Sequence, residues 1–340
     1  MTPPPAQLGF VAIGRNEGER LGRCLASLRT IGAPIVYVDS GSTDGSVDRA
    51  RAADASVVEL PTDQPFTAAR ARNAGFERLI AEYPLLPLVH FIDGDCELVP
   101  GWIDGALAAL AESPTLGVVC GRRVERTPDA SIYNRLCDIE WDTPVGPAKA
   151  CGGDALFRVL AFVQVGGFNP AVIAGEEPEL CVRLRAAGWG VRRIGHDMTL
   201  HDAAITRFSQ WWRRTVRAGH AYAQGAALHG KPPERHGVRE LRSMLAWSLG
   251  PPALALALAW PTRGLSLLVL PLAYGALFVR VARGQRRLGR SAPHARLYAA
   301  SIVVAKFAML RGAAKFWLSS LSGRNPAIIE YKRPVTPAPK

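Results

Sequence analysis

The chain has 340 residues, of which 48% are hydrophobic and 21% are charged, so it can bury a sizeable core. This length suggests about two domains. The 33 glycines and 26 prolines follow no period, which excludes collagen-like and low-complexity chains. The six cysteines form no CxxC pair, and the first residues lack a basic segment followed by an apolar run. We therefore expect reduced thiols, no zinc knuckle and a cytosolic soluble part.

The net charge of +12 is distributed unevenly along the chain. Residues 1–202 carry 19 basic and 26 acidic side chains, whereas residues 203–340 carry 22 basic and 3 acidic ones. A basic segment beside apolar runs suits the anionic surface of a membrane. Nucleic-acid-binding proteins usually place such charge on a folded surface that also carries aromatic residues. We therefore expect a membrane as a partner and no nucleic acid.

The first two hundred residues alternate short apolar runs with longer helical patterns, which is typical of an α/β domain with a mostly parallel sheet flanked by helices. Thr67 is the predicted N-cap of the third helix. The predicted strands cover 8–14, 35–38, 55–59, 87–92 and 117–121, and the predicted helices lie near 18–30, 44–53, 67–82 and 101–112.

A polar cluster, VDSGSTDGS at 38–46, follows the second predicted strand. Open α/β sheets bind ligands at this edge, where helix N-termini and backbone amides converge. A turn with a capping box accounts for residues 40–44. It does not provide the donor that the carboxylate of Asp39 needs at the end of a buried strand. Asp39 is therefore a candidate binding residue.

A second cluster, DGDCEL at 93–98, follows the apolar run PLVHFI. Asp93 and Asp95 are separated by one glycine, so their charges repel unless a cation joins them. Carboxylate oxygens suit Mg²⁺ or Mn²⁺ bound together with a diphosphate. A solvated turn is the alternative, and the adjoining strand together with the Asp39 cluster favours the cation site.

The order of six segments closely resembles the family 2 glycosyltransferases, whose fold is the nucleotide-diphospho-sugar transferase (GT-A) domain. The resemblance covers about residues 8–220 and is carried by the common order and spacing of the segments. These are IGRNEGERLGRCLASL (13–28), VDSGSTDGS (38–46), ARNAG (71–75), DGDCEL (93–98), CGGDALFR (151–158) and GEEPELCVRLRAAGW (175–189).

The resemblance implies three residues that contact the nucleotide. In that family, the aspartate at the position of Asp39 contacts the base or the ribose, and the arginine at the position of Arg72 reaches the base or the phosphates. A guanidinium in the first turns of a helix can bind two such oxygens at once. Glu17, near the first strand, resembles a second residue beside the base.

The resemblance also implies a metal site for Mg²⁺ or Mn²⁺. Asp95 resembles the direct metal ligand, and Asp93 resembles the residue that touches the ribose or metal-bound water. His201 resembles the histidine that completes the metal coordination in some GT-A enzymes. A structural histidine is the alternative, because a lone histidine more often has that role.

The segment CGGDALFR is expected to form the acceptor side, with Gly152, Gly153 and Asp154 as the candidate acceptor-binding residues. Two glycines before a strand allow the backbone to approach a sugar closely. A simple β-turn at Gly152 and Gly153 is an equally weighted alternative.

The segment GEEPELCVRLRAAGW resembles the start of the helix that carries the general base. Relatives have Glu-Asp here, and the second acid deprotonates the acceptor hydroxyl, so Glu177 takes that place with one additional methylene. Glu176 is the reserve candidate. The helix N-terminus lowers the proton affinity of both acids, and each acid raises that of the other. The alternative is that both acids only cap the helix and take no part in catalysis.

The segment QWWRR at 210–214 matches the Gln-x-x-Arg-Trp motif of processive members only at Gln210 and Arg213, because Arg214 stands where tryptophan is expected. We therefore expect a non-processive enzyme that adds one sugar. Trp211 and Trp212 are expected at the membrane interface or against the domain.

The C-terminal part contains two uncharged runs, at 243–260 and 264–279. As helices they would be about 27 and 24 Å long, close to the hydrocarbon thickness of a bilayer. Basic residues flank the pair on both outer sides, so the positive-inside rule predicts a hairpin at about 243–280 with both ends in the cytoplasm. The alternatives are a re-entrant or interfacial hairpin at the membrane and a buried helical hairpin in a soluble domain.

Residues 297–318 are apolar but contain Lys306, which would cost about 2.5–3.5 kcal/mol deep in lipid, so we predict an interfacial helix here. The predicted domains are thus 1–225 for the glycosyltransferase and 226–322 for the basic linker, hairpin and interfacial helix, followed by a flexible tail at 323–340.

The expected function is inverting transfer of a sugar from a nucleotide-diphospho-sugar to a hydroxyl of a membrane- or envelope-associated glycan or lipid. A UDP-sugar is favoured by the resemblance alone, and the enzyme is expected on the cytoplasmic side of the membrane. Transfer onto a polyprenyl phosphate and a non-catalytic scaffold that binds sugar nucleotides are the alternatives.

Overall fold

The computed structural model describes residues 7–322, which divide into two compact units. The first unit contains residues 7–128 and 140–204, and the second contains residues 129–139 and 205–322. The division after Ala204 lies ahead of the boundary expected at residue 225. The tail expected to be flexible, at 323–340, lies outside the described residues.

Within the described residues, the first unit contains a mixed sheet of nine strands in the order β3-β2-β1-β4-β8-β6-β9-β5, with β7 paired to β9. The strands are β1 (Leu8–Gly14), β2 (Ile35–Asp39), β3 (Ser56–Glu59), β4 (Leu88–Asp93), β5 (Cys96–Leu98), β6 (Leu116–Glu125), β7 (Gly146–Pro147), β8 (Ala155–Arg158) and β9 (Gly190–His201).

The predicted α/β class is confirmed, and the five predicted strands correspond to β1, β2, β3, β4 and β6. The sheet is parallel from β3 through β2 and β1 to β4. It is mixed beyond β4, because β8 pairs antiparallel with both β4 and β6 while β9 runs parallel to β6. Strand β8 is short and its motif CGGDALFR was interpreted for binding, so its place in the middle of the sheet was not predicted.

The register of the parallel strands brings the two polar clusters to one edge. Gly14 at the end of β1 pairs with Asp39 of β2, and Ile13 pairs with Asp93 of β4. The ends of β2 and β4 therefore flank the end of β1. This is the carboxyl edge of the sheet, where open α/β folds bind their ligands.

The helices assigned mainly to the first unit confirm the four predicted ones, and Thr67 caps α3 by accepting a hydrogen bond from the backbone N–H of Arg70. Gly75 lets α3 approach β1 and β2, because an added Cβ there would collide with Val11 and Val38. The helices are α1 (Glu19–Arg29), α2 (Ser46–Ala52), α3 (Ala68–Glu82), α4 (Trp102–Ala111), α6 (Val159–Gln164) and α7 (Glu176–Ala186).

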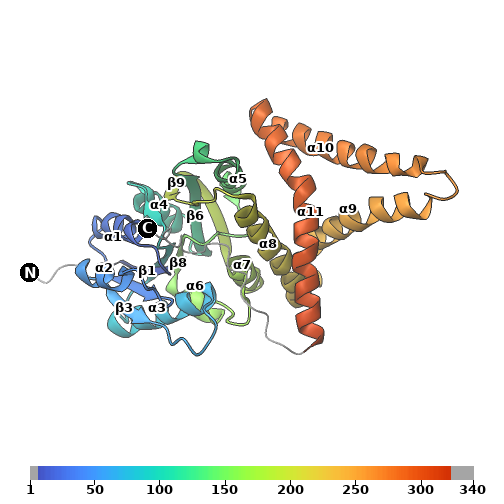
Figure 1. The fold of residues 1–340 in the computed structure, drawn as a ribbon. Coiled ribbons are helices and arrows are strands. Elements are labelled where there is room, and N and C mark those ends of the chain that lie inside the picture. The colour runs from blue at the N-terminus through green and yellow to red at the C-terminus, as the bar shows by residue number, and fades with distance from the viewer. Residues whose placement is uncertain (1–6, 323–340) are drawn as a thin grey trace, which may run out of the picture. The chain divides into compact units, whose positions relative to one another are not determined.

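The regular structure in the described residues of the second unit is helical, and loops and turns connect the helices. Helix α11 packs closely on α8 through Gly219 and Gly312, where an added Cβ would collide with the backbone of the facing helix. Helices α9 and α10 form the predicted hairpin (Figure 1). Most of α5 (Ile132–Trp141), which follows the 3₁₀ turn η1 (Pro128–Ala130), also belongs to the second unit. The other helices of this unit are α8 (Phe208–His229), α9 (Val238–Ala257), the 3₁₀ turn η2 (Leu265–Leu268), α10 (Val269–Arg287) and α11 (Ala292–Leu321).

Two segments of the described chain are long and apolar enough to span a membrane, Leu265–Arg287 and Ala292–Leu321. The second arm predicted at 264–279 falls within the first of these segments, the first arm predicted at 243–260 falls in neither, and the helix predicted to be interfacial at 297–318 falls within the second. The first arm ends at Ala257, and its first turns carry charged residues, so α9 is not a candidate. Helix α11 is a candidate although it contains Lys306, whose ammonium donates a hydrogen bond to the Ser243 hydroxyl at 3.0 Å.

Candidate active site

Asp39 is buried at the end of β2 and is bound by donors close to it in the chain. One carboxylate oxygen accepts hydrogen bonds from the backbone N–H groups of Gly41 (2.9 Å) and Ser42 (2.7 Å), and the other accepts one from the Tyr37 hydroxyl (3.1 Å). Burial and the charge of Asp39 raise the pKa of Tyr37, which therefore remains a donor. The interpretation that the turn leaves Asp39 without donors was wrong: the turn itself supplies them.

Glu17 lies beside the Asp93–Gly94–Asp95 loop. Its carboxylate forms an ion pair with Arg20 at 2.8 Å, and a Cβ at Gly94 would lie 3.5 Å from the Glu17 Cγ. The backbone N–H of Gly94 donates to the carbonyl of Ile13 at 2.8 Å, which holds this loop against the end of β1. Glu17 and the aspartate loop therefore share one edge of the sheet.

Arg72 joins the aspartate loop to the start of α7. Its guanidinium is almost completely buried and lies 2.8 Å from Asp93 Oδ1, 2.8 Å from Glu176 Oε1 and 3.7 Å from Glu177 Oε1. Burial alone would lower the pKa of Arg72, but the three carboxylates raise it. The side chain that was predicted to reach the nucleotide is thus engaged by protein carboxylates.

Gly153 lies where the charged side chains of this cluster come closest to the backbone, and a residue with a side chain would not fit there. Arg72 donates to the Gly153 carbonyl at 3.3 Å. A Cβ at Gly153 would lie 2.8–2.9 Å from atoms of Asp93, Arg72 and Arg123. Gly152 has a left-handed φ of +80° and no neighbour within 4 Å of an added Cβ. The two glycines therefore differ: Gly152 makes the turn, and Gly153 provides space for the charged cluster.

Asp154 is fully buried and supports the cluster from within the sheet. Its carboxylate accepts hydrogen bonds from the backbone N–H of Asp93 (2.9 Å) and the Thr199 hydroxyl (2.7 Å), and it lies 2.8 Å from Arg123. Arg123 also lies 3.2 Å from Asp93. The expectation that Asp154 binds the acceptor does not fit this burial. Asp93, for its part, is held between two guanidinium groups.

Asp95 and His201 form the second half of the site. They meet because Cys96, next to Asp95 in the chain, pairs with His201 in the antiparallel ladder of β5 and β9. The distance from His201 Nε2 to Asp95 Oδ2 is 3.4 Å, and both side chains are buried. On the other side of the ring, Nδ1 lies 3.6 Å from Glu125 Oε2. Glu125 is itself fixed by the backbone N–H of Ala203 at 3.1 Å.

These donors fit a divalent cation. Adjacent ligands of an octahedral ion bound at about 2.1 Å lie about 3 Å apart, close to the separation of Asp95 and His201. Cys96 is within reach of the same point, but burial raises its pKa well above the ordinary value, so the thiol stays protonated. Carboxylate suits Mg²⁺ and Mn²⁺, and imidazole favours the transition metal. The predicted metal residues therefore separate: Asp95 and His201 can ligate together, whereas Asp93 is already paired with arginines.

Glu177 is positioned at the start of α7, directly after Gly175, which has a left-handed φ of +79°. Its side chain keeps 17% of its surface exposed, whereas that of Glu176 keeps 5%. Burial and then the charge of Glu176 raise the pKa of Glu177 to about 7, against the opposing effect of Arg72. A carboxylate with this pKa can accept a proton near neutral pH. Of the two candidate bases, Glu177 is thus the more accessible one.

The motif residues of α8 have structural roles within the second unit. The Gln210 side chain accepts hydrogen bonds from the backbone N–H groups of Thr206 and Arg207, both at 3.0 Å, and so caps its own helix. Trp211 is buried and stacks on Tyr133 with ring centroids 6.3 Å apart. Trp211 was expected either at the membrane interface or against the domain, and in the structure it packs against the protein.

Three residues of the site were missed by the sequence analysis: Arg123, Glu125 and Trp141. The Trp141 ring contacts His201 edge-on at 4.6 Å, and the Arg123 guanidinium lies over the same tryptophan at 5.5 Å. The available signal was the charged end of an otherwise apolar strand, GVVCGRRVE at 117–125. A charge that ends a buried strand needs a partner, as was argued for Asp39.

Comparisons with known proteins show what the sequence and the fold of this chain resemble. The model of the family described as Glycosyl transferase family 2 matches residues 11–147. A curated relative, the pre-mycofactocin glycosyltransferase of Mycobacterium tuberculosis, is 27% identical over 227 residues, which cover 63% of this chain and 46% of the relative. The chain thus spans about half the length of the curated relatives it matches.

Among solved structures, a mannosyltransferase from Pyrobaculum calidifontis in complex with GDP-Man and Mn²⁺ matches with a TM-score of 0.58. The match covers 93% of this chain and 88% of that chain at 18% sequence identity, so it shows a shared fold. The chain is therefore similar to glycosyl transferase family 2 over residues 11–147, and it shares the fold of this mannosyltransferase.

Proposed function

We propose that this protein transfers a sugar from a nucleotide-diphospho-sugar to a hydroxyl of a membrane- or envelope-associated glycan or lipid, with inversion at the anomeric carbon. The observation that carries this proposal is the bridge made by Arg72, which contacts Asp93 of the aspartate loop and both acids at the start of α7. A loop suited to a metal diphosphate and a carboxylate suited to a general base are thereby fixed in one rigid cluster.

In the proposed reaction, Glu177 accepts the proton of the acceptor hydroxyl while the hydroxyl oxygen forms a bond to the anomeric carbon. The bond from that carbon to the diphosphate oxygen breaks, and the nucleoside diphosphate leaves with the bonding electrons. Arg72 and Glu176 position Glu177, and a base of this kind contributes about 10²–10⁴-fold.

Asp95 and His201 would hold the divalent cation, Mn²⁺ or Mg²⁺, and when bound this ion stabilises the charge that develops on the leaving diphosphate. Asp93, held by Arg72 and Arg123, stays beside it as an oriented acceptor for a ribose hydroxyl or a water molecule. Asp39 and Glu17 lie at the same edge, on the side of the nucleotide base.

We propose a location at the cytoplasmic side of a membrane, with the basic second unit in contact with the lipid. The two candidate spans and the excess of basic residues in 203–340 support this location. A UDP-sugar is the favoured donor because of the motif resemblance. GDP-mannose belongs in any test, because the structurally similar mannosyltransferase was determined with GDP-Man.

The test is transfer from a panel of UDP- and GDP-sugars, with Mn²⁺, to a membrane lipid extract, using detergent-solubilised protein and mass spectrometry of the products. Glu177→Gln should lower kcat by about 10²–10⁴-fold and leave donor binding unchanged. Asp104→Asn is the matched control, because it makes the same change from carboxylate to carboxamide at an exposed position in the first turn of α4. This variant should keep full activity.

Two other outcomes would contradict the proposal. If Glu177→Gln is almost harmless, the nucleophile is a group that carries no proton, such as a polyprenyl phosphate. If donors bind and no panel member is turned over by the wild type, the protein is a scaffold for sugar nucleotides.

A further inference from the structure

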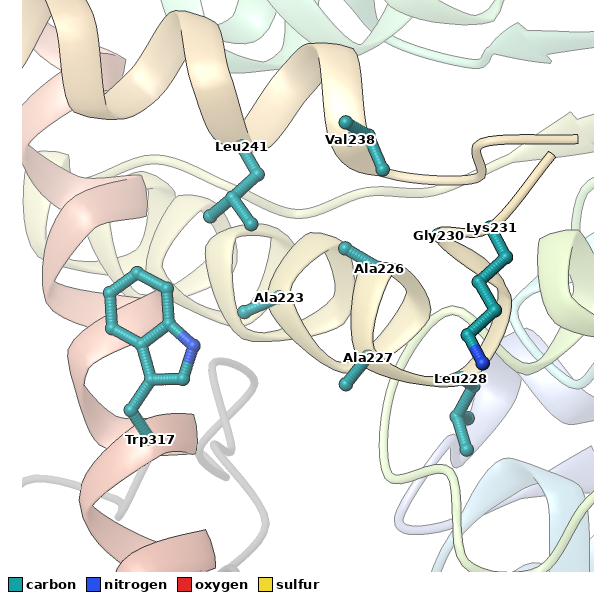
Figure 2. Close-up of a pocket in the computed structure, with 9 residues that line it drawn as sticks. All are labelled: Ala223, Ala226, Ala227, Leu228, Gly230, Lys231, Val238, Leu241 and Trp317. Carbon is teal, nitrogen blue, oxygen red and sulfur yellow. The ribbon is translucent and has the colours of Figure 1, made fainter.

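The groups that could hold a metal ion lie in the first unit. Among the described residues, two clusters of possible ligands come together: Asp95, Cys96 and His201, and Asp93, Cys96 and Asp154. The second unit contains an open hollow of about 560 Å³ among α8, α9 and α11, which Figure 2 shows with the residues that line it. None of those residues is an acid, a histidine or a cysteine. A residue that tunes metal binding is therefore expected around the clusters of the first unit.

The His201 ring has protein contacts on three sides. Nε2 lies 3.4 Å from Asp95 Oδ2, and Nδ1 lies 3.6 Å from Glu125 Oε2. The third contact is the Trp141 ring, whose centroid lies 4.6 Å from that of His201 at an interplanar angle of 75°. The two carboxylates fix where the nitrogens point, but the ring could still turn about the line that joins these two contacts. The edge-on contact opposes this turn, because it is a favoured arrangement of two aromatic rings. Trp141 thus fixes the plane of the imidazole.

Trp141 also contacts the other half of the site. The Arg123 guanidinium lies over its ring, with Cζ 5.5 Å from the ring centroid. A cation in this position is attracted by the face of the indole. Arg123 in turn lies 2.8 Å from Asp154 and 3.2 Å from Asp93. One side chain therefore contacts both the candidate metal ligand and the cation that holds the aspartate loop.

Trp141 makes these contacts without being part of the hydrophobic core. It is the last residue of α5 and is half-buried, and it lies outside the main cluster of buried apolar side chains in the first unit. Within residues 7–322, its indole N–H has no acceptor, so the ring itself makes the contacts with the site. A change at this position should therefore act on the site more than on the core.

We infer that Trp141 is a positioning residue of the candidate cation site, which holds the His201 ring in the plane that suits a transition-metal ion such as Mn²⁺. The inference rests on the metal site of the proposed function and adds to it a preference between two ions. An imidazole ligand favours a transition metal over Mg²⁺, which binds mainly through carboxylate and water oxygens. A ring held in one plane should therefore strengthen the binding of Mn²⁺ more than that of Mg²⁺.

The test is calorimetric titration of the full chain in detergent with MnCl₂ and, separately, with MgCl₂, both without nucleotide. Trp141→Leu keeps apolar bulk and removes the aromatic ring. We expect it to weaken Mn²⁺ binding about 2–10-fold, which is the strength of one aromatic pair, and to weaken Mg²⁺ binding less. Trp141→Phe keeps an aromatic ring and should bind Mn²⁺ almost as well as the wild type.

Trp189→Leu is the matched control. Trp189 is also a half-buried tryptophan of the first unit, but it directly precedes β9, whereas His201 is the last residue of that strand. Its indole N–H donates to Gln164 Oε1 at 3.0 Å. Trp189→Leu should therefore leave Mn²⁺ binding unchanged, whatever its effect on the stability of the fold.

Three results would overturn the inference: unchanged Mn²⁺ affinity in Trp141→Leu, equal losses for Mn²⁺ and Mg²⁺ in that variant, or Trp141→Phe as weak as Trp141→Leu. Each of these leaves the metal site of the wild type intact. A wild type that binds neither ion would contradict the metal site of the proposed function, and this inference with it.

Discussion

The two units bury different kinds of side chain. Among the described residues, all buried Asp, Glu and Arg side chains lie in the first unit: Asp39, Arg72, Asp95, Glu125, Asp154, Glu176, Glu179 and Arg193. The second unit buries mainly small residues and exposes large apolar ones. Of the 24 large hydrophobic residues that are exposed in the described chain, 18 lie in the second unit.

This difference has a physical consequence for each unit. A buried charge is stable only when it is paired and hydrogen-bonded, so the first unit gives each carboxylate of its cluster a fixed donor or cation. Exposed apolar surface is stable only where something other than water covers it. The first unit is therefore organised for electrostatics, and the exposed apolar surface of the second unit needs a cover other than water, for which we proposed a membrane.

The largest expected effect on stability comes from removing one buried cation of the first unit. Arg123→Ala removes the partner of the fully buried Asp154 and one of the two partners of Asp93, so it should lower the free energy of unfolding by about 3–5 kcal/mol. Arg283→Ala on the exposed side of α10 should change it by less than about 0.5 kcal/mol. Chemical denaturation of both variants measures the difference, and equal losses would contradict the distinction between the units.

The next effect is a pH dependence that comes from Glu177. A base must be deprotonated to act, and the pKa of Glu177 is about 7. We therefore expect kcat/KM to fall about tenfold for each pH unit below 7, and to be constant above it. A pH–rate profile with a constant metal concentration measures this, and a profile that stays level down to pH 5 would exclude Glu177 as the base.

The same raised pKa has a consequence for stability. Because the folded state holds the Glu177 proton more tightly than the unfolded state, the folded state loses stability as the pH rises from the ordinary carboxyl pKa toward 7. Glu177→Gln removes this loss, so the variant should be more stable than the wild type above pH 7 and equal to it at pH 4. Thermal unfolding at the two pH values provides the measurement.

The sequence identified the edge of the sheet where these groups gather, because apolar runs followed by Asp39 and Asp93 indicate the ends of parallel strands. The residues that complete the site were less visible. Strand β6 has register shifts between Cys120 and Arg122 and again at Arg123, and such bulges change the face to which side chains point. Simple alternation therefore could not place Arg123 or Glu125 on the side of the aspartates.

His201 shows the second limit of sequence reasoning. It is far from Asp95 in the chain, and only the pairing of β5 with β9 brings the two together. The family resemblance suggested His201, whereas spacing alone did not. Asp39 shows the opposite case, since its backbone donors are only two and three residues away and belong to the turn that follows it.

A smaller effect is expected from Glu125, which faces Nδ1 of His201 while Nε2 faces Asp95. A carboxylate behind a metal-binding histidine fixes the orientation of the ring, and its loss typically lowers metal affinity about 10–100-fold. We expect Glu125→Gln to weaken Mn²⁺ binding by this factor, as measured by calorimetry without nucleotide. Asp95→Asn should weaken it more, and Mn²⁺ affinity that is unchanged in Glu125→Gln would assign a purely structural role to Glu125.

The smallest effects distinguish packed from unpacked surfaces inside the second unit. At Gly275 in α10 an added Cβ meets no neighbour, so Gly275→Ala should stabilise the helix by about 0.5–1 kcal/mol. At Gly312 in α11 it would collide with the carbonyl of Val216 in α8, so Gly312→Ala should cost about 1–3 kcal/mol. Thermal unfolding in detergent compares the two. If the two substitutions change the stability in opposite directions, α8 and α11 form the protein core of this unit and the surface of α10 at Gly275 has no protein neighbour. If both substitutions are stabilising, that division is contradicted.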